Sequence, residues 1–500
     1  MLSAVTILVL SIIVVVVLLY LYVTQWAFKY WDRRGIACIA PKFPLGNAQT
    51  GKASTRMHSS VLFARFYAQL KRCDGSFGGI YLFTRPIAVA LKLDFVRDVL
   101  TRDFQHFSDR GIFYNEQDDP LSANLFTLTR DKWSVLRAKL TPTFSTGRMK
   151  EMAVLVAKVA HELQFCLREA LTEGSTVEIK DLMARFTTDV IGSCAFGIDC
   201  NSLRDPHNTF KEMAQRVFQP SSRSRFQQLF MTAFPSLAKL LHMRTFDRQI
   251  TSFFRAVVEE TMRQRDFEGP GQRNDFMDLL MKLRDSDAGL TTNEIAAQAL
   301  IFFSAGFESS SSTLTFCLFE LALNESIQQR VREEIEAISP KYDNQITYES
   351  ISEMKYLDMV INETLRKYPP LGSLFRRVTQ PYMSPEGEIL AKDMNLIIPI
   401  YAIHHDPDIY EDPETFNPDR FAPEEIRRRH RCAFLPFGDG PRNCIALRFG
   451  LMQTKIGLVA LLRRFAFRPS STTPRSISFT RKSFTLTPDG GLWLNAVELV

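Results

Sequence analysis

The 500-residue sequence lacks the marks of several protein classes. Its eight cysteines are scattered and none forms a C-x-x-C pair, which argues against a disulfide framework and against a zinc site. No G-x-G-x-x-G follows a strand-like segment and no P-loop occurs, so nucleotide binding by those routes is unsupported. The formal charge of +6 is too weak to indicate nucleic acid binding. We find no internal repeat and no low-complexity tract.

Long apolar runs are also missing, except at the start of the chain. Residues 4–23 carry no charge, and about 20 helical residues span the roughly 30 Å hydrocarbon core of a bilayer. No basic residue precedes the run and no small-x-small cleavage site follows it, which favours an uncleaved anchor over a signal peptide. The expected aromatic belt after the run is Tyr20, Tyr22, Trp26, Tyr30 and Trp31. The basic residues that place the rest of the chain on the cytosolic side are Lys29, Arg33 and Arg34.

Three parts are expected: a transmembrane anchor at 1–24, a linker with a proline hinge at 25–50, and one catalytic domain at 51–500. Pro41 and Pro44 limit the flexibility of that linker. The fold class is mainly α with small β-sheets. Periodicity predicts helices at 145–171, 246–265 and 291–337, the last broken near Asn324. Strand-like stretches lie at 79–93, 388–400 and 476–494, and the last of these contains a hairpin signal at Asp489-Gly490-Gly491.

The stretch Phe437-Gly-Asp-Gly-Pro-Arg-Asn-Cys444 places one thiol after a glycine-rich turn and before a helix predicted from 445 to about 463. The start of a helix favours a thiolate, and a thiolate in a shielded loop can hold a heme iron. Arg442 can pair with a nearby carboxylate such as a heme propionate. A lone cysteine is otherwise most often a buried structural thiol.

This stretch resembles the heme-binding signature of the cytochrome P-450 family, Phe-x-x-Gly-x-Arg-x-Cys-x-Gly, with Ala446 in place of the last glycine. The resemblance extends over nearly the whole chain and is closest to insect microsomal members related to the vertebrate drug-metabolising group. It implies the cytochrome P-450 fold, one catalytic domain behind the anchor, and heme b with Cys444 as the axial iron ligand. Phe437 is expected to contact the cofactor.

Further motifs in the family's order support the resemblance. Glu363 and Arg366 match its Glu-x-x-Arg pair, with Arg420 as the second arginine; alone, an exposed ion pair has the same spacing. The resemblance implies that these three residues fix the cysteine loop. Trp133, Arg137 and Arg376 match propionate-binding positions, with Arg377 as the competing choice to Arg376. His404 and His405 are interpreted as structural.

Ala305-Gly-Phe-Glu308-Ser309 resembles the family's Ala-Gly-x-Asp/Glu-Thr motif, in which an acid and an alcohol deliver protons to iron-bound dioxygen. Glu308 and Ser309 take those positions, with serine in place of the usual threonine. Four consecutive serines, 309–312, weaken a helix, so something must require them.

The resemblance implies a heme-thiolate monooxygenase that inserts one oxygen atom into a lipophilic small molecule. It implies electrons from NADPH through an NADPH-cytochrome reductase, with a cytochrome b-type protein as a further donor, and location in the endoplasmic reticulum membrane facing the cytosol. A reductase-independent heme-thiolate isomerase or dehydratase and a non-catalytic heme protein are the alternatives. The basic docking candidates are Arg427, Arg428, Arg429 and Arg431. Expected substrate contacts lie at 109–126, 218–234, 302–303, 371–374 and 483–486.

Overall fold

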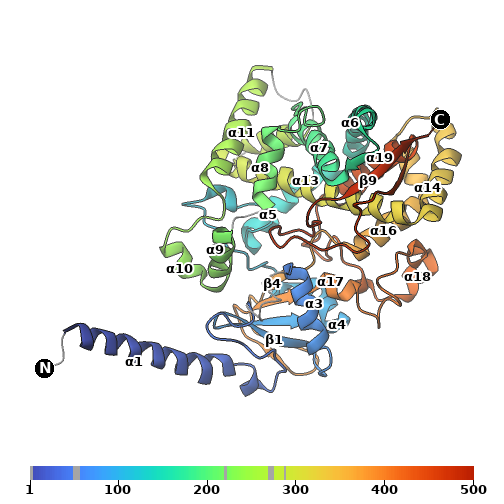
Figure 1. Ribbon diagram of the computed structural model, residues 1–500. Coiled ribbons are helices and arrows are strands. Elements are labelled where there is room, and N and C mark those ends of the chain that lie inside the picture. Colours follow the sequence, from blue (N-terminus) through green and yellow to red (C-terminus); the bar gives the residue numbers. More distant parts are fainter. Residues whose placement is uncertain (1–3, 49–56, 219–221, 269–274, 286–288, 500) are drawn as a thin grey trace.

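The computed structural model describes residues 4–48, 57–218, 222–268, 275–285 and 289–499. The expected boundary between linker and catalytic domain, at residues 50 and 51, lies outside them. Figure 1 shows a helical body with a β-rich end, and one helix that extends away from that end. This helix, α1 (Ala4–Gln25), is long and apolar enough to cross a membrane.

The helices of the body give it its bulk. In chain order they are α3 (Ser59–Leu70), α4 (Leu93–Arg97), α5 (Arg130–Leu140), α6 (Thr146–Glu173), α7 (Ile179–Ile191), α8 (Thr209–Phe218), α9 (Ser222–Ala233), α10 (Pro235–Leu240), α11 (Arg248–Glu268), α12 (Phe276–Arg284), α13 (Thr292–Leu323), α14 (Glu325–Ile338), α15 (Tyr348–Glu353), α16 (Lys355–Lys367), α17 (Ile400–His404), α18 (Pro423–Arg428) and α19 (Leu447–Leu462).

The strands form small sheets, as expected. One sheet has the order β1-β2-β7-β4, a second β3-β9-β8, and a third pairs β5 with β6. Their bounds are β1 (Phe77–Leu82), β2 (Arg85–Ala90), β3 (Thr176–Glu178), β4 (Leu374–Arg377), β5 (Tyr382–Met383), β6 (Ile389–Leu390), β7 (Asn395–Ile398), β8 (Phe465–Pro469) and β9 (Trp493–Glu498).

Helix α13 is the central helix of the helical part. It is buried along most of its length and contacts α7, α8, α11, α16 and α19. Its start is fixed by a capping box in which Thr291 and Glu294 satisfy each other's backbone N–H groups. Asn324 separates α13 from α14, which confirms the predicted break. The helices predicted at 145–171 and 246–265 are confirmed as α6 and α11.

The hairpin predicted at 489–491 is wrong. Phe479 pairs with Pro488 in an isolated antiparallel bridge, so the chain reverses within residues 480–487 instead. Gly490 and Gly491 do adopt positive φ angles, of 82° and 81°. They lead into β9, which pairs with β8 and β3 because its apolar face packs in the helical core.

The end of the expected aromatic belt belongs to the body and not to a membrane interface. Trp31 is fully buried, and its indole N–H donates to the Ile80 carbonyl over 3.2 Å. A Cβ on Gly79 would lie 2.4 Å from the Trp31 ring, so only glycine allows this ring to lie on the strand. Ile39 also donates its N–H to the Gly79 carbonyl. The segment between the anchor and residue 48 is therefore packed on the first sheet.

Candidate active site

The cysteine loop is closed by its own backbone. The Cys444 N–H donates to the Phe437 carbonyl over 2.8 Å. Gly440 has a φ of 69°, and a Cβ there would lie 1.8 Å from the Leu100 carbonyl oxygen, so glycine is required. Ala446, the N-cap of α19, has a φ of −98°, which any residue adopts. The departure from the family's final glycine therefore introduces no backbone strain.

The thiol of Cys444 faces the interior. Burial raises its pKa and outweighs the Ala446 backbone hydrogen bond and the attraction of Arg137 and Arg110, which lower it. The side chain nevertheless keeps accessible surface, and both observations hold if it faces a space enclosed by protein. The expected thiolate is thus not produced by the helix start alone. A bound metal cation deprotonates a coordinating thiol outright.

Two buried arginines lie close to this loop with unsatisfied nitrogens. Arg376 and Arg442 are 1% and 2% exposed. Nε of Arg376 and both Nε and Nη1 of Arg442 have no hydrogen-bond partner among the described residues. Burial lowers the pKa of Arg376 to about 10 and that of Arg442 to about 9. Arg442 also has Asp109 at 3.7 Å. Native proteins rarely leave buried donors unpaired, so these nitrogens point to a ligand that accepts hydrogen bonds.

Helix α5 contributes the two other predicted contacts. Arg137 donates from Nη1 and Nη2 to the backbone and side-chain oxygens of Asn443, over 2.8 and 2.9 Å. The Arg442 guanidinium stacks over the Trp133 ring, 4.1 Å from its centroid. Both helix residues therefore touch the segment that ends in Cys444.

The sequence reasoning missed Arg110 as a member of this cluster. Its Nη2 donates to the Arg442 carbonyl over 2.8 Å, and its Nη1 donates to the Phe126 carbonyl over 3.1 Å. Burial lowers its pKa well below the usual value, and the charges of Arg376, Arg442 and Arg137 add to that shift. No spacing motif marks Arg110, because it lies in an irregular loop. The tertiary fold alone brings it here.

These residues fit heme b. Four guanidinium groups gather near one thiol, and the closest carboxylate to Arg442 is Asp109 at 3.7 Å. The three partnerless nitrogens are suited to carboxylate groups, which accept charge-assisted hydrogen bonds. A flat macrocycle with two propionates and an iron offers partners for both the arginines and Cys444.

Comparison with known proteins agrees with this fit. Residues 48–495 match the family model described as Cytochrome P450. The chain belongs to the cytochrome P-450 family. It is 43% identical to "Probable cytochrome P450 6a14" of Drosophila melanogaster over 93% of this chain and 95% of that protein. It is 41% identical to "Cytochrome P450 6a2" of the same fly, over 96% and 97%. It is 40% identical to "Cytochrome P450 6A1" of Musca domestica, over 95% of each chain.

As a cytochrome P-450, the protein is a heme-thiolate monooxygenase, an oxidoreductase whose heme iron takes a cysteine as axial ligand. Membership also implies a redox partner and a lipophilic substrate. The predicted family and mainly α fold are thereby confirmed, and so are the class of enzyme and its cofactor.

The Glu-x-x-Arg pair of this P-450 is buried, unlike an ordinary surface pair. Glu363 and Arg366 are fully buried on α16, and the guanidinium donates to both carboxylate oxygens over 2.7 and 2.9 Å. The Asn417 N–H donates to Oε1 of Glu363 over 3.0 Å. Arg420 approaches the same oxygen only to 3.5 Å. The carboxylate therefore ties α16 to the segment 417–420, with Arg420 as its weaker partner.

Helix α13 carries the acid and the alcohol on different sides. Oε1 of Glu308 accepts from Lys180 Nζ over 2.9 Å and from Thr487 Oγ1 over 3.1 Å. The Ser309 hydroxyl donates back to the Ala305 carbonyl over 2.6 Å. Ala305 is exposed in the middle of this otherwise buried helix, so the Ala305–Ser309 side faces open space inside the body. In this arrangement the carboxylate is held away from the hydroxyl.

Of two expected substrate contacts, Phe303 is part of the core, whereas Phe302 is partly buried and packs against it. The Phe302 ring stacks on Phe276 at a centroid distance of 4.1 Å and on Phe144 at 5.7 Å. Phe303 packs against rings that include Phe196, at 5.8 Å. Both therefore hold α13 to its neighbours. Of the expected stretch 218–234, residues 219–221 lie outside the described residues.

The expected docking arginines have different surroundings. Arg429 stacks over the Tyr410 ring at 4.5 Å and donates to the Arg420 carbonyl, so it is a structural residue. Arg431 pairs with Asp439 of the cysteine loop at 2.7 Å. Arg428 pairs with Glu425 on α18, and Arg427 is exposed. The exposed basic surface therefore contains fewer of these arginines than the sequence suggested.

A surface groove lies apart from this site. It measures about 650 Å³ and lies between α6, residues 344–349 and the end of α19. Its lining includes Lys158, His161 and Arg463, but none of the residues that surround Cys444.

Proposed function

We propose that this cytochrome P-450 inserts one atom of dioxygen into a lipophilic small molecule of xenobiotic or endogenous lipid or hormone metabolism. Electrons come from NADPH through a flavoprotein NADPH-cytochrome reductase, with a cytochrome b-type protein as a further donor. The second oxygen atom leaves as water. The observation that carries this proposal is the group of four arginines beside the interior thiol of Cys444.

Each residue of the site has a defined task in this proposal. Cys444 would hold the heme iron through its thiolate, and Phe437 closes its loop through the backbone. Arg376 and Arg442, with Arg110 and Arg137 beside them, hold the two propionates and stay charged at neutral pH. When bound, the heme supplies the oxidative chemistry, which the thiolate promotes.

Glu308 and Ser309 handle protons in the proposed reaction. The Ser309 hydroxyl, on the side that faces the interior space, would hold a proton at Oγ for the reaction. The Glu308 carboxylate, which pairs with Lys180, would take up a proton from water and pass it to that hydroxyl. Because its Oε1 is bonded to Lys180 and Thr487, the carboxylate must turn on its side chain to reach Ser309. The presence of both groups favours a monooxygenase over a reductase-independent isomerase.

The protein is proposed to reside in the endoplasmic reticulum membrane with its body in the cytosol. α1 supports this, since it has no charged residue, is strongly apolar, and only Val23 of it is buried in the protein. A lipophilic substrate dissolved in the bilayer would then be concentrated next to the enzyme.

Isotope incorporation with reconstituted enzyme tests the proposal. The full chain is combined with NADPH-cytochrome reductase, NADPH, ¹⁸O₂ and a panel of lipophilic compounds that give type I spectral shifts. Products should carry one ¹⁸O atom and depend on NADPH. Turnover of a lipid hydroperoxide without NADPH, with no ¹⁸O in the product, would establish the isomerase instead. Cys444→Ser should abolish both turnover and the thiolate-type spectrum of the reduced carbonyl complex.

A further inference from the structure

The loop 483–487 exposes a single residue. Ser483, Thr485, Leu486 and Thr487 are all 7% exposed or less, whereas the Phe484 side chain is 42% exposed. The Leu486 N–H donates to the Pro370 carbonyl over 3.1 Å, which fixes the loop two residues after Phe484. An apolar ring gains little free energy from an exposed position. The position of this ring must therefore be set by the contacts of the buried residues around it.

The ring of Phe484 lies near β4, the strand that carries Arg376. The N–H of Phe484 donates to the Phe218 carbonyl at the end of α8 over 3.1 Å. Its ring lies 6.4 Å from the Phe375 ring, and Phe375 directly precedes Arg376 on β4. A lipophilic substrate bound near β4 would meet this exposed ring.

A single carboxylate oxygen holds this loop to α13. Oε1 of Glu308 accepts from Thr487 Oγ1 over 3.1 Å and lies 3.5 Å from Thr485 Oγ1. The same oxygen accepts from Lys180 Nζ of α7 over 2.9 Å, and Ser312 Oγ lies 3.5 Å away. Every partner named here meets Oε1. Hydrogen bonds to a charged acceptor are about twice as strong as neutral ones, so this contact is a strong one for the loop.

Lys180 stabilises the charge of that oxygen. It is only 13% exposed, and besides Glu308 its Nζ donates to Ser311 and Ser312 over 3.0 and 3.1 Å. These contacts account for part of the serine run in α13, which would otherwise weaken the helix. A buried carboxylate without its cation would be costly, so Lys180 and Glu308 form one unit.

We propose that Glu308 is a positioning residue for substrate: through Oε1 it anchors the loop 483–487 by Thr487 and so sets the place of Phe484, while Lys180 pairs with the same oxygen. This inference rests on the proposed function, since Phe484 selects substrates only if a lipophilic molecule enters the interior. It adds a second task to a carboxylate that is otherwise assigned to protons, and it makes Thr487 a determinant of specificity without substrate contact.

Thr487→Val tests the anchor in the intact, heme-loaded protein. It removes the hydroxyl and keeps the shape of the side chain. Hydrogen exchange of a peptide covering 483–487 should become about tenfold faster, as expected for a lost hydrogen bond to a charged group. The affinity for 4-phenylimidazole, measured by its spectral shift, should change about threefold or more, because under this proposal its phenyl group would occupy the space that Phe484 borders. The affinity for imidazole, which has no such group, should stay the same.

Matched variants separate the anchor from general damage. Thr480→Val lies in the same chain reversal, and its hydroxyl has no contact with Glu308, so it should leave exchange and both affinities unchanged. Thr487→Ser keeps a hydroxyl and should restore the wild-type values. Lys180→Met should loosen the loop as Thr487→Val does.

These experiments test the anchor without any measurement of turnover. If Thr487→Val matches Thr480→Val in exchange and in 4-phenylimidazole binding, the anchor is refuted even when the enzyme is an active monooxygenase. If Thr487→Val fails to fold, Lys180→Met and Thr487→Ser give the same two readouts, and equal loop exchange in Lys180→Met and wild type refutes the proposal. Failure of the proposed function would appear separately, as NADPH-independent turnover.

Discussion

Nε2 of His404 accepts the backbone N–H of Leu435 over 2.9 Å, and Nδ1 of the same ring donates to the Arg366 carbonyl over 3.0 Å. Because Nε2 accepts, the ring is neutral with its proton on Nδ1, and burial lowers the pKa of His404 well below its usual value. Arg366 returns a bond from Nη1 to the His404 carbonyl. This imidazole therefore links the buried ion pair of α16 to the segment that leads into the cysteine loop.

His404→Ala should impair heme retention more than it impairs folding. The change leaves the Leu435 N–H and the Arg366 carbonyl unpaired, at about 1–3 kcal/mol for each buried group. The loop then moves relative to α16. The heme-to-protein ratio after purification, with circular dichroism as a check on folding, measures the effect.

His405→Phe is the matched control, since the ring stacks on Tyr401 at 4.1 Å and is not bonded to the loop. It should retain heme at the wild-type level. A His404→Ala protein with full heme content would contradict the role of His404.

Lowering the pH should destabilise the protein through His405. Burial lowers its pKa to about 4, whereas in the unfolded chain it is near the usual 6.5. Below 6.5 the unfolded state therefore binds a proton that the folded state does not, and stability falls as the pH drops toward 4. Each pH unit in this window costs about 1.4 kcal/mol per histidine. The free energy of unfolding in urea between pH 7 and 5 measures it, and His405→Phe should flatten the slope by about one proton.

The adjacent arginines 376 and 377 should differ in their effect on heme. Arg376 is buried with an unpaired Nε, whereas Arg377 is 38% exposed at its side chain and pairs with Asp393 at 2.8 Å. Arg376→Gln should release heme to apomyoglobin about tenfold faster, because it loses a charge-assisted contact. Arg377→Gln should release heme at the wild-type rate. The reverse order would show that the propionates lie on the other side of β4.

Much of this site could be predicted because its motifs are local in sequence. Cys444, Arg442 and the Glu363–Arg366 pair lie within short spacings that identify them before any fold is known. Arg110 could not be found this way, since it joins the cluster only through contacts with Arg442, more than 300 residues later. Phe303 was misjudged for a related reason: an aromatic residue in a central helix can face either a substrate or a neighbouring helix, and the sequence does not tell which.

The hairpin expected at Asp489-Gly490-Gly491 was wrong for a similar reason. Both glycines take the positive φ that a turn requires, but the partner of the following strand is β8, more than 20 residues earlier. Turn chemistry is local, whereas strand pairing depends on which apolar faces meet in the core. The break at Asn324 and the capping box at Thr291 were predictable because both are decided within one helical turn.

Ser309→Thr should reduce the release of peroxide per NADPH consumed. The added methyl group restricts rotation about the side-chain bond, so the hydroxyl spends more time in one orientation. Ser252→Thr is a suitable control, because this serine also donates to a carbonyl of its own helix, α11, but is exposed on the surface of that helix. Equal peroxide release from wild type and Ser309→Thr would refute the effect.

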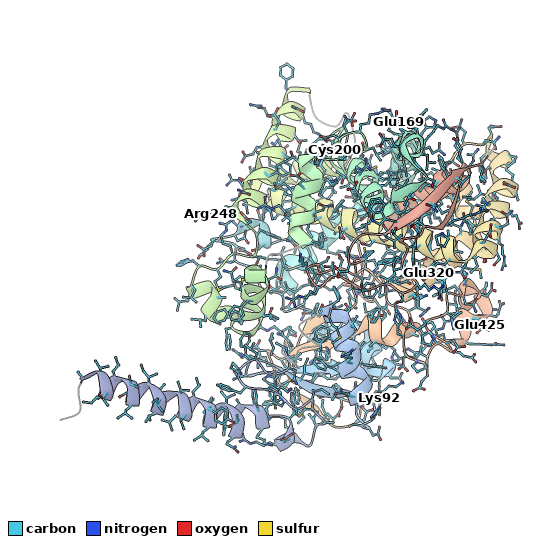
Figure 2. The ribbon with its side chains drawn as sticks, viewed as in Figure 1. Lys92, Glu169, Cys200, Arg248, Glu320 and Glu425 are labelled. Carbon is cyan, nitrogen blue, oxygen red and sulfur yellow. The ribbon has the colours of Figure 1, made fainter. Side chains whose placement is uncertain are left out.

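Arg427→Glu should weaken electron delivery in a salt-dependent manner. α18 lies near the segment that leads to Cys444, and an acidic flavoprotein would be attracted to its exposed charge. Reductase-dependent turnover should fall at low ionic strength, and the difference from wild type should shrink as salt rises. Arg248→Glu is the control, since Figure 2 shows Arg248 on the side of the molecule opposite Glu425 of α18. Arg429 is unsuitable, because reversing its charge would disturb the Tyr410 stack.

The buried indole of Trp31 lies only six positions after Gln25, the last residue of α1. The segment that joins α1 to the body is therefore very short. If α1 spans a membrane, the first sheet is held close to the membrane surface and the body cannot move freely about its anchor. Compounds that partition into that membrane would then meet the β-rich end of the protein, while α6 and α14 lie on the side of the body away from α1 (Figure 1).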